Sequence, residues 1–330
     1  MSLFTLGARF AADARRLSTT IKIPKDDALR EIRRLAAHAL KLSSAQLAIR
    51  EREAPGRFDL SPYGIVFDRR LRGEPLTYIM GECGFREHVF RVTPDVLIPR
   101  SETEELVDAA LRIIDNENVT RILDLGTGSG CVAISLALER PFVAVTASEV
   151  LESALVVAKE NAERLGATNV TFLLSDWYDS VDQDAFDMIV SNPPYIRESD
   201  THLDALRYEP PVALIGGEDG LDALRKVVSL APRHLRPGGA LLVEHGFDQQ
   251  EAVVSLFEAA GFSMLHVLRD LSGNPRMVAG KMGERAPVRP PQEKGTGQRL
   301  GLRRAAFKLR EQKEHELVAW YRFRPKGVEI

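Results

Sequence analysis

The chain has 330 residues, of which 44% are hydrophobic and 28% are charged, and its formal net charge is −3. This length predicts about two domains, and the hydrophobic fraction excludes a disordered or collagen-like chain. No apolar run reaches the ~20 residues that cross a bilayer, and two cysteines, Cys83 and Cys131, exclude a disulfide scaffold and favour a reducing compartment. Residues 1–283 carry 32 Lys/Arg against 41 Asp/Glu, which argues against a broad nucleic-acid surface there.

The first twenty residues allow two interpretations. They contain three arginines and one aspartate, which weakly resembles a mitochondrial transit peptide. They also form a helical pattern whose inner face would hold Phe4, Leu6, Phe10 and Leu17. The helix is favoured, so we expect a cytoplasmic protein, with the mitochondrial matrix as the alternative.

Residues 24–80 predict further helices. Pro24 and Asp26 suit a helix start, and apolar residues follow at helical spacing as far as Leu40. Ser43 or Ser44 caps a next helix, and another short helix covers Ile65 to Leu71. We therefore expect an N-terminal helical domain over residues 1–80, which serves either to dock a substrate or only to pack against the rest.

Strand formers then replace the helical pattern. Residues 81–99 predict a β-hairpin linker, with turn signals at Gly84 and around Pro94. Ser101 and Glu104 have the spacing of a capping box, which predicts a helix through Ile114.

From residue 121 strands alternate with helices. Strands are expected at 121–125, 143–147, 170–174, 186–191 and 240–244, and helices at 130–138, 151–165, 220–235 and 248–260. This alternation predicts an α/β fold with a mostly parallel, twisted, Rossmann-like sheet. Ligands of such sheets bind beyond the carboxyl ends of the strands, so the residues after each strand are the candidates for a site.

A glycine-rich loop follows the first of these strands. Asp124 lies near the end of the strand, and the loop reads Gly126, Thr127, Gly128, Ser129 and Gly130. Alternate glycines let a backbone turn sharply and approach a ligand closely. The dinucleotide fingerprint would need a third glycine where Cys131 stands. The alternative is an ordinary strand-to-helix turn.

Two further strands end at residues suited to a nucleoside. Glu149 lies at the distance from the glycine loop at which an acidic residue holds a ribose diol, or it only begins a helix. Asp176 could accept from an adenine amino group and Trp177 offers a flat ring, although a tryptophan in the core is the alternative.

The most specific signal is the sequence Asn192, Pro193, Pro194 and Tyr195 after the fourth strand. Two prolines prevent the strand from continuing, which frees the Asn192 side chain and the Pro193 carbonyl. Two acceptors aimed at a planar NH₂ group would orient it for attack, and Tyr195 would pack beside it. A polar proline turn is the alternative.

These motifs resemble the cofactor site of class I S-adenosylmethionine-dependent methyltransferases and the Asn-Pro-Pro-Tyr motif of enzymes that methylate planar nitrogens. Residues 73–81, 97–104, 208–210 and 243–246 make the chain similar to the peptide chain release factor glutamine methyltransferase family, the HemK/PrmC type, over residues 25–283. Many relatives carry Asp where this chain has Glu149.

The resemblance implies methyl transfer from S-adenosyl-L-methionine to the glutamine amide nitrogen in the Gly-Gly-Gln motif of class-1 release factors, with S-adenosyl-L-homocysteine as product. It implies a methyltransferase domain over residues 100–283. The glycine loop would hold the methionine part, Glu149 the ribose, and Asp176 with Trp177 the adenine. Asn192 and Pro193 would hold the glutamine amide. We expect no metal, because no cluster has ligand spacing.

The last segment, residues 284–330, lies outside the resemblance and carries 12 Lys/Arg and 6 Asp/Glu. Its proline- and glycine-rich start predicts a linker, and residues 299–321 could form a basic helix. It either contacts RNA or an acidic partner, or is a solvated extension.

Two other functions remain open at this stage. A DNA adenine-N6 methyltransferase uses a similar motif on an exocyclic NH₂ group, but the acidic composition argues against it. A non-catalytic module that binds release factors or RNA on a methyltransferase fold is disfavoured by the intact glycine loop and Asn192.

Overall fold

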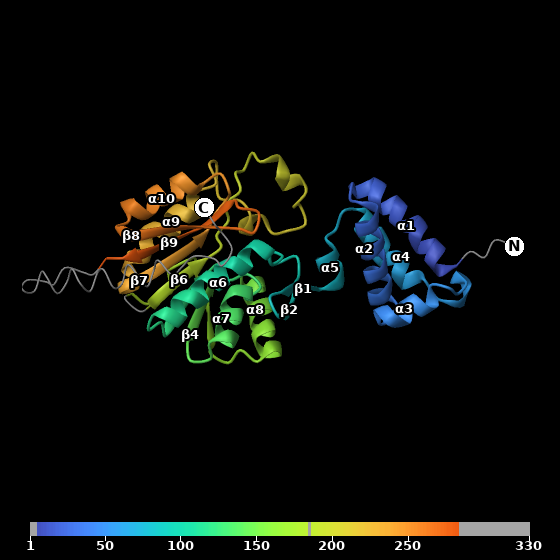
Figure 1. The fold of residues 1–330 in the computed structure, drawn as a ribbon, viewed down its shortest axis with the longest axis horizontal. Helices are drawn as coiled ribbons and strands as arrows, with labels where there is room; N and C mark the ends of the chain where they lie inside the picture. Colours follow the sequence, from blue (N-terminus) through green and yellow to red (C-terminus); the bar gives the residue numbers. More distant parts are fainter. Residues whose placement is uncertain (1–4, 184–185, 284–330) are drawn as a thin grey trace, which may run out of the picture.

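The computed structural model describes residues 5–183 and 186–283. Figure 1 shows a small helical lobe and a larger α/β lobe, joined by a short connection. The helical lobe, residues 5–80 and here called the N-terminal lobe, contains α1 (Leu6–Ile21), α2 (Lys25–Ala39), α3 (Ser44–Arg50), η1 (Pro55–Arg57), α4 (Ser61–Leu71) and α5 (Leu76–Met80). No helix of the described residues combines the length and apolarity that a membrane span requires.

The N-terminal lobe has its own core. Leu6, Phe10 and Leu17 are fully buried on one face of α1, as the helical pattern predicts, whereas Phe4 lies outside the described residues. They pack with apolar side chains of α2 and α4 in a single cluster. The predicted cap of α3 is confirmed, because Ser43 and Gln46 form a reciprocal capping box.

A two-stranded hairpin, β1 (Glu82–Phe85) and β2 (His88–Arg91), connects the lobes and confirms the predicted hairpin. The next helix, α6 (Ser101–Asn116), has Arg100 as its N-cap residue and no side-chain hydrogen bond at the cap. The prediction of a capping box between Ser101 and Glu104 is therefore wrong. Glu104 instead accepts a hydrogen bond from the backbone N–H of Arg86 in the hairpin turn, at 2.9 Å. The Glu104 side chain thus contacts the hairpin turn instead of the start of its own helix.

The large lobe contains a seven-stranded sheet in the order β5-β4-β3-β6-β7-β9-β8. Strands β3 to β7 are parallel, which confirms the predicted fold class, while β9 runs antiparallel to both of its neighbours. The strands are β3 (Arg121–Leu125), β4 (Ala144–Glu149), β5 (Val170–Leu174), β6 (Phe186–Ser191), β7 (Leu235–Glu244), β8 (Phe262–Arg269) and β9 (Pro275–Met282).

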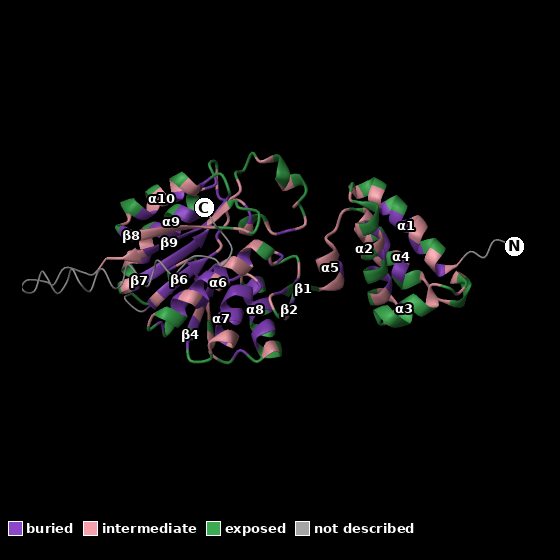
Figure 2. Cartoon of the chain, in the orientation of Figure 1, coloured by how far each residue is buried: buried purple, intermediate pink, exposed green. Residues whose placement is uncertain are grey.

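Helices cover both faces of this sheet (Figure 2), so its strands are buried. Alternate residues of the strands pack in one core with α6 and α7, and the remaining ones in a second core with α9 and α10. The helices are α7 (Cys131–Glu139), α8 (Glu152–Leu165), α9 (Asp222–Leu230) and α10 (Gln250–Ala259), with short 3₁₀ turns η2 (Thr201–Asp204), η3 (Pro211–Ala213) and η4 (Ala231–Arg233).

The long segment between β6 and α9, residues 192–221, joins the two lobes. The Tyr208 hydroxyl donates to the main-chain oxygen of Arg72, just after α4, at 3.0 Å. The next residue, Glu209, is buried and accepts from the backbone N–H of Ile98 and from the Arg100 guanidinium, at 3.1 and 2.6 Å. One stretch of this segment is thus fixed to the N-terminal lobe and to the chain that enters α6.

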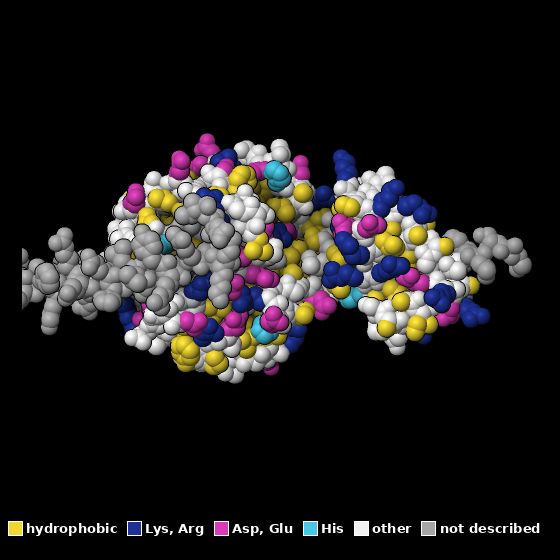
Figure 3. Space-filling model, viewed as in Figure 1, with side chains coloured by type: hydrophobic (Ala, Val, Ile, Leu, Met, Phe, Trp, Pro, Cys, Tyr) yellow, Lys and Arg dark blue, Asp and Glu magenta, His cyan; other side chains and the backbone are white. Residues whose placement is uncertain are grey.

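The two lobes carry opposite charge. Residues 1–80 contain 15 Lys/Arg and 9 Asp/Glu, whereas residues 81–283 contain 17 and 32. The basic side chains are prominent on the N-terminal lobe in Figure 3. The acidic excess that the whole sequence shows therefore resides in the large lobe alone.

Candidate active site

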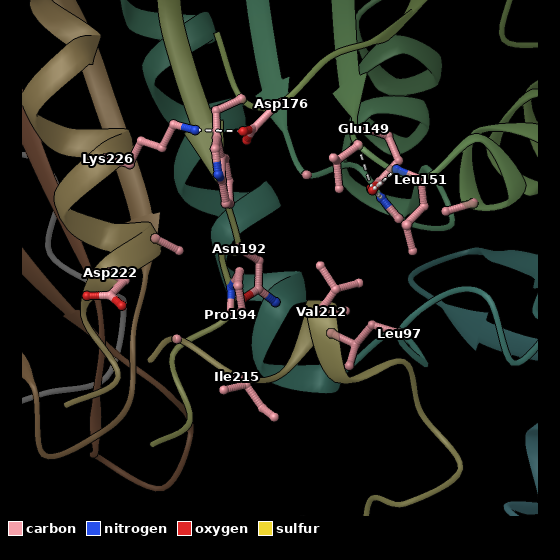
Figure 4. A pocket seen from close by; sticks show the side chains of 18 of the residues that line it. Leu97, Glu149, Leu151, Asp176, Asn192, Pro194, Val212, Ile215, Asp222 and Lys226 are labelled. Atoms are coloured by element: carbon pink, nitrogen blue, oxygen red, sulfur yellow. Dashed lines mark hydrogen bonds and ion pairs between the residues drawn. The ribbon is translucent and has the colours of Figure 1, made fainter. Parts of the chain in front are cut away.

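A cavity of about 570 Å³ opens at the carboxyl ends of the parallel strands. It is lined by the glycine loop, the end of β4, the segment after β5 and the segment after β6, and Figure 4 shows their side chains converging on it. This volume is in the range of small-molecule sites. The cavity brings together Gly126, Gly128, Glu149, Asp176, Trp177, Asn192 and Pro194.

The glycine loop has a backbone that other residues adopt rarely. Gly126 and Gly128 have φ of +69° and +55°, in the left-handed region. The N–H groups of Gly126 and Thr127 both donate to the Ser148 carbonyl, which fixes the loop to β4. Gly130 has another role, since it precedes α7 and a Cβ there would lie 2.7 Å from the Ile134 side chain.

A smaller cavity adjoins the loop and is lined by Asp124, Thr127, Ser129 and Asn192, among others. Asp124 is 2% exposed and accepts a hydrogen bond from the Thr127 hydroxyl at 2.7 Å. Its burial raises the pKa of the carboxyl group to about 7, although the hydrogen bond opposes this. A cation in this cavity would favour the ionised form of Asp124.

Glu149 is the last residue of β4, and its carboxylate is largely occupied. Oε1 accepts from the backbone N–H groups of Val150 and Leu151, and Oε2 accepts from that of Gly128 at 2.9 Å. A carboxylate offers about four lone-pair sites, so one site on Oε2 remains for a hydroxyl group. This side chain holds the glycine loop and faces the large cavity at the same time.

Asp176 and Trp177, in the segment after β5, line the same cavity as Glu149. The Asp176 carboxylate forms an ion pair with Lys226 of α9 at 2.8 Å, drawn as a dashed line in Figure 4. Trp177 has φ +54°, which is unusual for a large side chain. Its ring lies 3.6 Å from the position that a Cβ of Gly126 would occupy, so the ring packs directly against the glycine loop.

Asn192 lies where three cavities meet. It lines the large cavity, the small one beside Asp124, and a third cavity of about 330 Å³ that is also lined by Pro193, Pro194 and Tyr195. The Asn192 Nδ2 group donates to the Thr103 hydroxyl at 3.0 Å. The Asn192 side chain thus lies between the large cavity and the third cavity, which is lined by Pro194 and Tyr195.

Sequence reasoning gave no site role to several residues that hold this segment. Thr103 and Glu244 are buried beside Asn192 and Tyr195. Gln249 donates to the main-chain oxygen of Tyr195 at 3.0 Å. A charged residue at the end of the last parallel strand was a signal for Glu244, but no sequence pattern links Thr103 or Gln249 to it.

Two protein-family models match parts of the chain. Residues 14–81 match the PrmC N-terminal domain, and residues 107–260 match the methyltransferase small domain. The first match covers most of the N-terminal lobe, and the second covers the five parallel strands of the sheet with the glycine loop and Asn192.

Curated relatives cover most of the chain. A release factor glutamine methyltransferase of Bordetella pertussis is 45% identical over 76% of this chain and 93% of its own length. One of Pseudomonas aeruginosa is 47% identical over 70% and 82%. Among solved structures, a methyltransferase from Pyrococcus furiosus is 19% identical, with a TM-score of 0.45, over 66% of this chain and 97% of that chain.

Proposed function

The chain belongs to the release factor glutamine methyltransferase family, and we propose that it methylates the side-chain amide nitrogen of the Gly-Gly-Gln glutamine in class-1 release factors. The observation that carries the proposal is the position of Asn192 at the junction of the three cavities. A donor in the large cavity and an amide in the third one would meet at this side chain.

The large cavity fits S-adenosylmethionine, which supplies a methyl group activated by its sulfonium. Left-handed glycines at 126 and 128 leave room for a ligand beside the backbone. The free acceptor site on Glu149 suits a ribose hydroxyl, and the Trp177 ring suits the adenine. Asp124, buried in the small cavity, suits the positively charged methionine end.

The Asn-Pro-Pro-Tyr segment orients the amide that accepts the methyl group. Asn192 Oδ1 and the Pro193 carbonyl accept the two amide protons, which aligns the nitrogen lone pair with the methyl carbon. Tyr195 packs against the planar amide. The nitrogen–carbon bond would form as the carbon–sulfur bond of the sulfonium breaks, leaving a neutral thioether, and the methylated nitrogen would lose one proton to water. Because the methyl group is already activated, alignment and proximity would supply most of the catalysis.

The N-terminal lobe docks the release factor. It is fixed to the segment that follows Asn192 through Tyr208, and its basic surface suits an acidic protein surface. Because this substrate is a translation factor, we place the enzyme with the ribosomes in the cytoplasm. The basic tail, residues 284–330, lies outside the described residues, and its contact with RNA or an acidic partner stays a prediction.

Methyl transfer from labelled S-adenosylmethionine to an unmethylated release factor tests the proposal. We expect label on the intact factor, none on a factor whose Gly-Gly-Gln glutamine is changed, and none with Asn192→Ala enzyme. Asn116→Ala is the matched control, because Asn116 is exposed at the last residue of α6 and lines none of the three cavities.

Two results would overturn the proposal. Label on duplex DNA without label on protein would assign the chain to the adenine methyltransferases. Absence of cofactor binding in calorimetry would instead indicate a non-catalytic module.

A further inference from the structure

We propose that Thr103 and Glu244 are positioning residues that hold the Asn192 amide group in the orientation that presents its oxygen to the substrate. The inference rests on the proposed function, in which Asn192 Oδ1 accepts a hydrogen bond from the glutamine amide.

Three hydrogen bonds link these residues in one chain. Asn192 Nδ2 donates to the Thr103 hydroxyl at 3.0 Å, and this hydroxyl donates to Glu244 Oε2 at 2.8 Å. The Tyr195 hydroxyl donates to the other oxygen, Glu244 Oε1, at 3.2 Å. The first turn of α6, the segment after β6 and the end of β7 thus meet at a single carboxylate.

Counting protons assigns the direction of each bond. A threonine hydroxyl has one proton, and an ionised carboxylate can only accept. The Thr103 proton therefore goes to Glu244, which leaves only the lone pairs of Thr103 for Asn192. Asn192 must offer its NH₂ group to them, and its Oδ1 then occupies the other edge of the planar amide group.

This orientation decides whether the site can work. The two ends of an asparagine amide have nearly the same shape, so packing alone does not select one. In the reversed orientation an NH₂ group would face the NH₂ group of the substrate, and two donors cannot bond. The selection must come from a hydrogen-bond partner, which Thr103 is.

The burial of Glu244 supports a functional role. The side chain is 1% exposed and Thr103 is 2% exposed. In the described part of the chain Glu244 forms no ion pair, because Arg276 pairs with Asp270 and acts on Glu244 only at longer range. A buried carboxylate without a cation costs stability. Here the carboxylate accepts from the Thr103 hydroxyl, which in turn holds Asn192, and from the Tyr195 hydroxyl.

The test compares Thr103→Val, which keeps the shape and removes the hydroxyl, with Thr103→Ser, which keeps the hydroxyl. We expect Thr103→Val to lower kcat by about tenfold or more, with an unchanged Kd for S-adenosylmethionine in calorimetry. Thr103→Ser should retain most of the activity.

Glu244→Gln provides the second, independent readout. Burial raises the pKa of Glu244 to about 7, against the hydrogen bonds of Thr103 and Tyr195 and the charge of Arg276, while Glu102 on α6 raises it further. Burial also lowers the pKa of the adjacent His245, which keeps it neutral. The wild-type kcat should therefore fall as the pH drops through about 7, and this ionisation should be absent in Glu244→Gln.

The outcomes separate the two proposals. Loss of methyl transfer in Asn192→Ala together with wild-type kcat in Thr103→Val and Glu244→Gln would overturn the positioning role and leave the proposed function intact. Wild-type activity in Asn192→Ala would overturn the role of Asn192 and with it the positioning role of Thr103 and Glu244, while methyl transfer to the release factor would stand. The proposed function itself would fail if the wild-type enzyme placed no label on the release factor. If Thr103→Val melts well below the wild type, the pH profile of Glu244→Gln decides the question.

Discussion

Replacing Gly216, which lines the large cavity, by alanine should slow methyl transfer more than it weakens cofactor binding. Gly216 lies beside the Asn-Pro-Pro-Tyr segment, and its N–H donates to the Ile196 carbonyl at 2.8 Å. A Cβ at this position would lie 2.7 Å from the carbonyl oxygens of both Pro194 and Gly220. Its φ is not in the left-handed region, so the effect would come from the steric contact and not from backbone strain.

The size of the effect follows from these distances. Cβ atoms in proteins essentially never approach other heavy atoms closer than 3.0 Å, so the backbone at Gly216, Pro194 or Gly220 must move by a few tenths of an ångström. A misplacement of about 1 Å can cost about 100-fold in rate, which suggests a loss of about tenfold in kcat for this smaller shift. Overpacking should also lower the free energy of unfolding by about 1–3 kcal/mol.

The assay measures kcat with a saturating release factor, together with the Kd for S-adenosylmethionine and the melting temperature. Gly64→Ala in α4 is the matched control, because a Cβ there meets nothing within 4 Å, and it should keep the activity and add up to about 1 kcal/mol of stability. A Gly216→Ala enzyme that is folded and has the wild-type kcat would refute the reasoning.

Two predictions concern the cofactor cavity. A glutamine in place of Glu149 must turn its NH₂ group either toward the N–H of Gly128 or toward the N–H groups of Val150 and Leu151, where two donors meet. For Glu149→Gln, calorimetry should therefore show a Kd for S-adenosylmethionine that is raised by about tenfold or more. An unchanged Kd would contradict the assignment of Glu149 to the cofactor site. Asp124 has a pKa of about 7, and a bound cation favours its ionised form, so the Kd should rise about tenfold from pH 8 to pH 6. Asp124→Asn should abolish this dependence, and its persistence there would exclude Asp124 as the titrating group.

Much of the large lobe could be predicted because its strands are buried and its site residues follow strand ends. Strands β3, β5 and β6 begin and end where the sequence predicts. The strands β8 and β9 were missed, since Phe262–Arg269 shows no clear alternation and Pro275–Met282 begins with proline and contains a glycine. Their position is fixed by pairing with β7 and with each other, which a local pattern does not contain.

The candidate site shows the same division between local and distant information. Asp124, Glu149, Asp176 and Asn192 could be selected because carboxyl ends of parallel strands meet at one edge. The hydrogen bond between Thr103 and Glu244 joins residues 141 positions apart, and the ion pair of Asp176 with Lys226 joins residues 50 apart. Such contacts exist only after the sheet has brought the segments together, so no spacing in the sequence predicts them.

The bond from Tyr208 to the main-chain oxygen of Arg72 has a consequence for how this enzyme can evolve. Every amino acid supplies a main-chain oxygen, so position 72 can change its side chain while the lobes stay attached. Natural variation at this junction would then show no paired substitutions between positions 72 and 208. A helical lobe from a distant relative could likewise be grafted onto this large lobe, provided that its chain turns in the same way after α4.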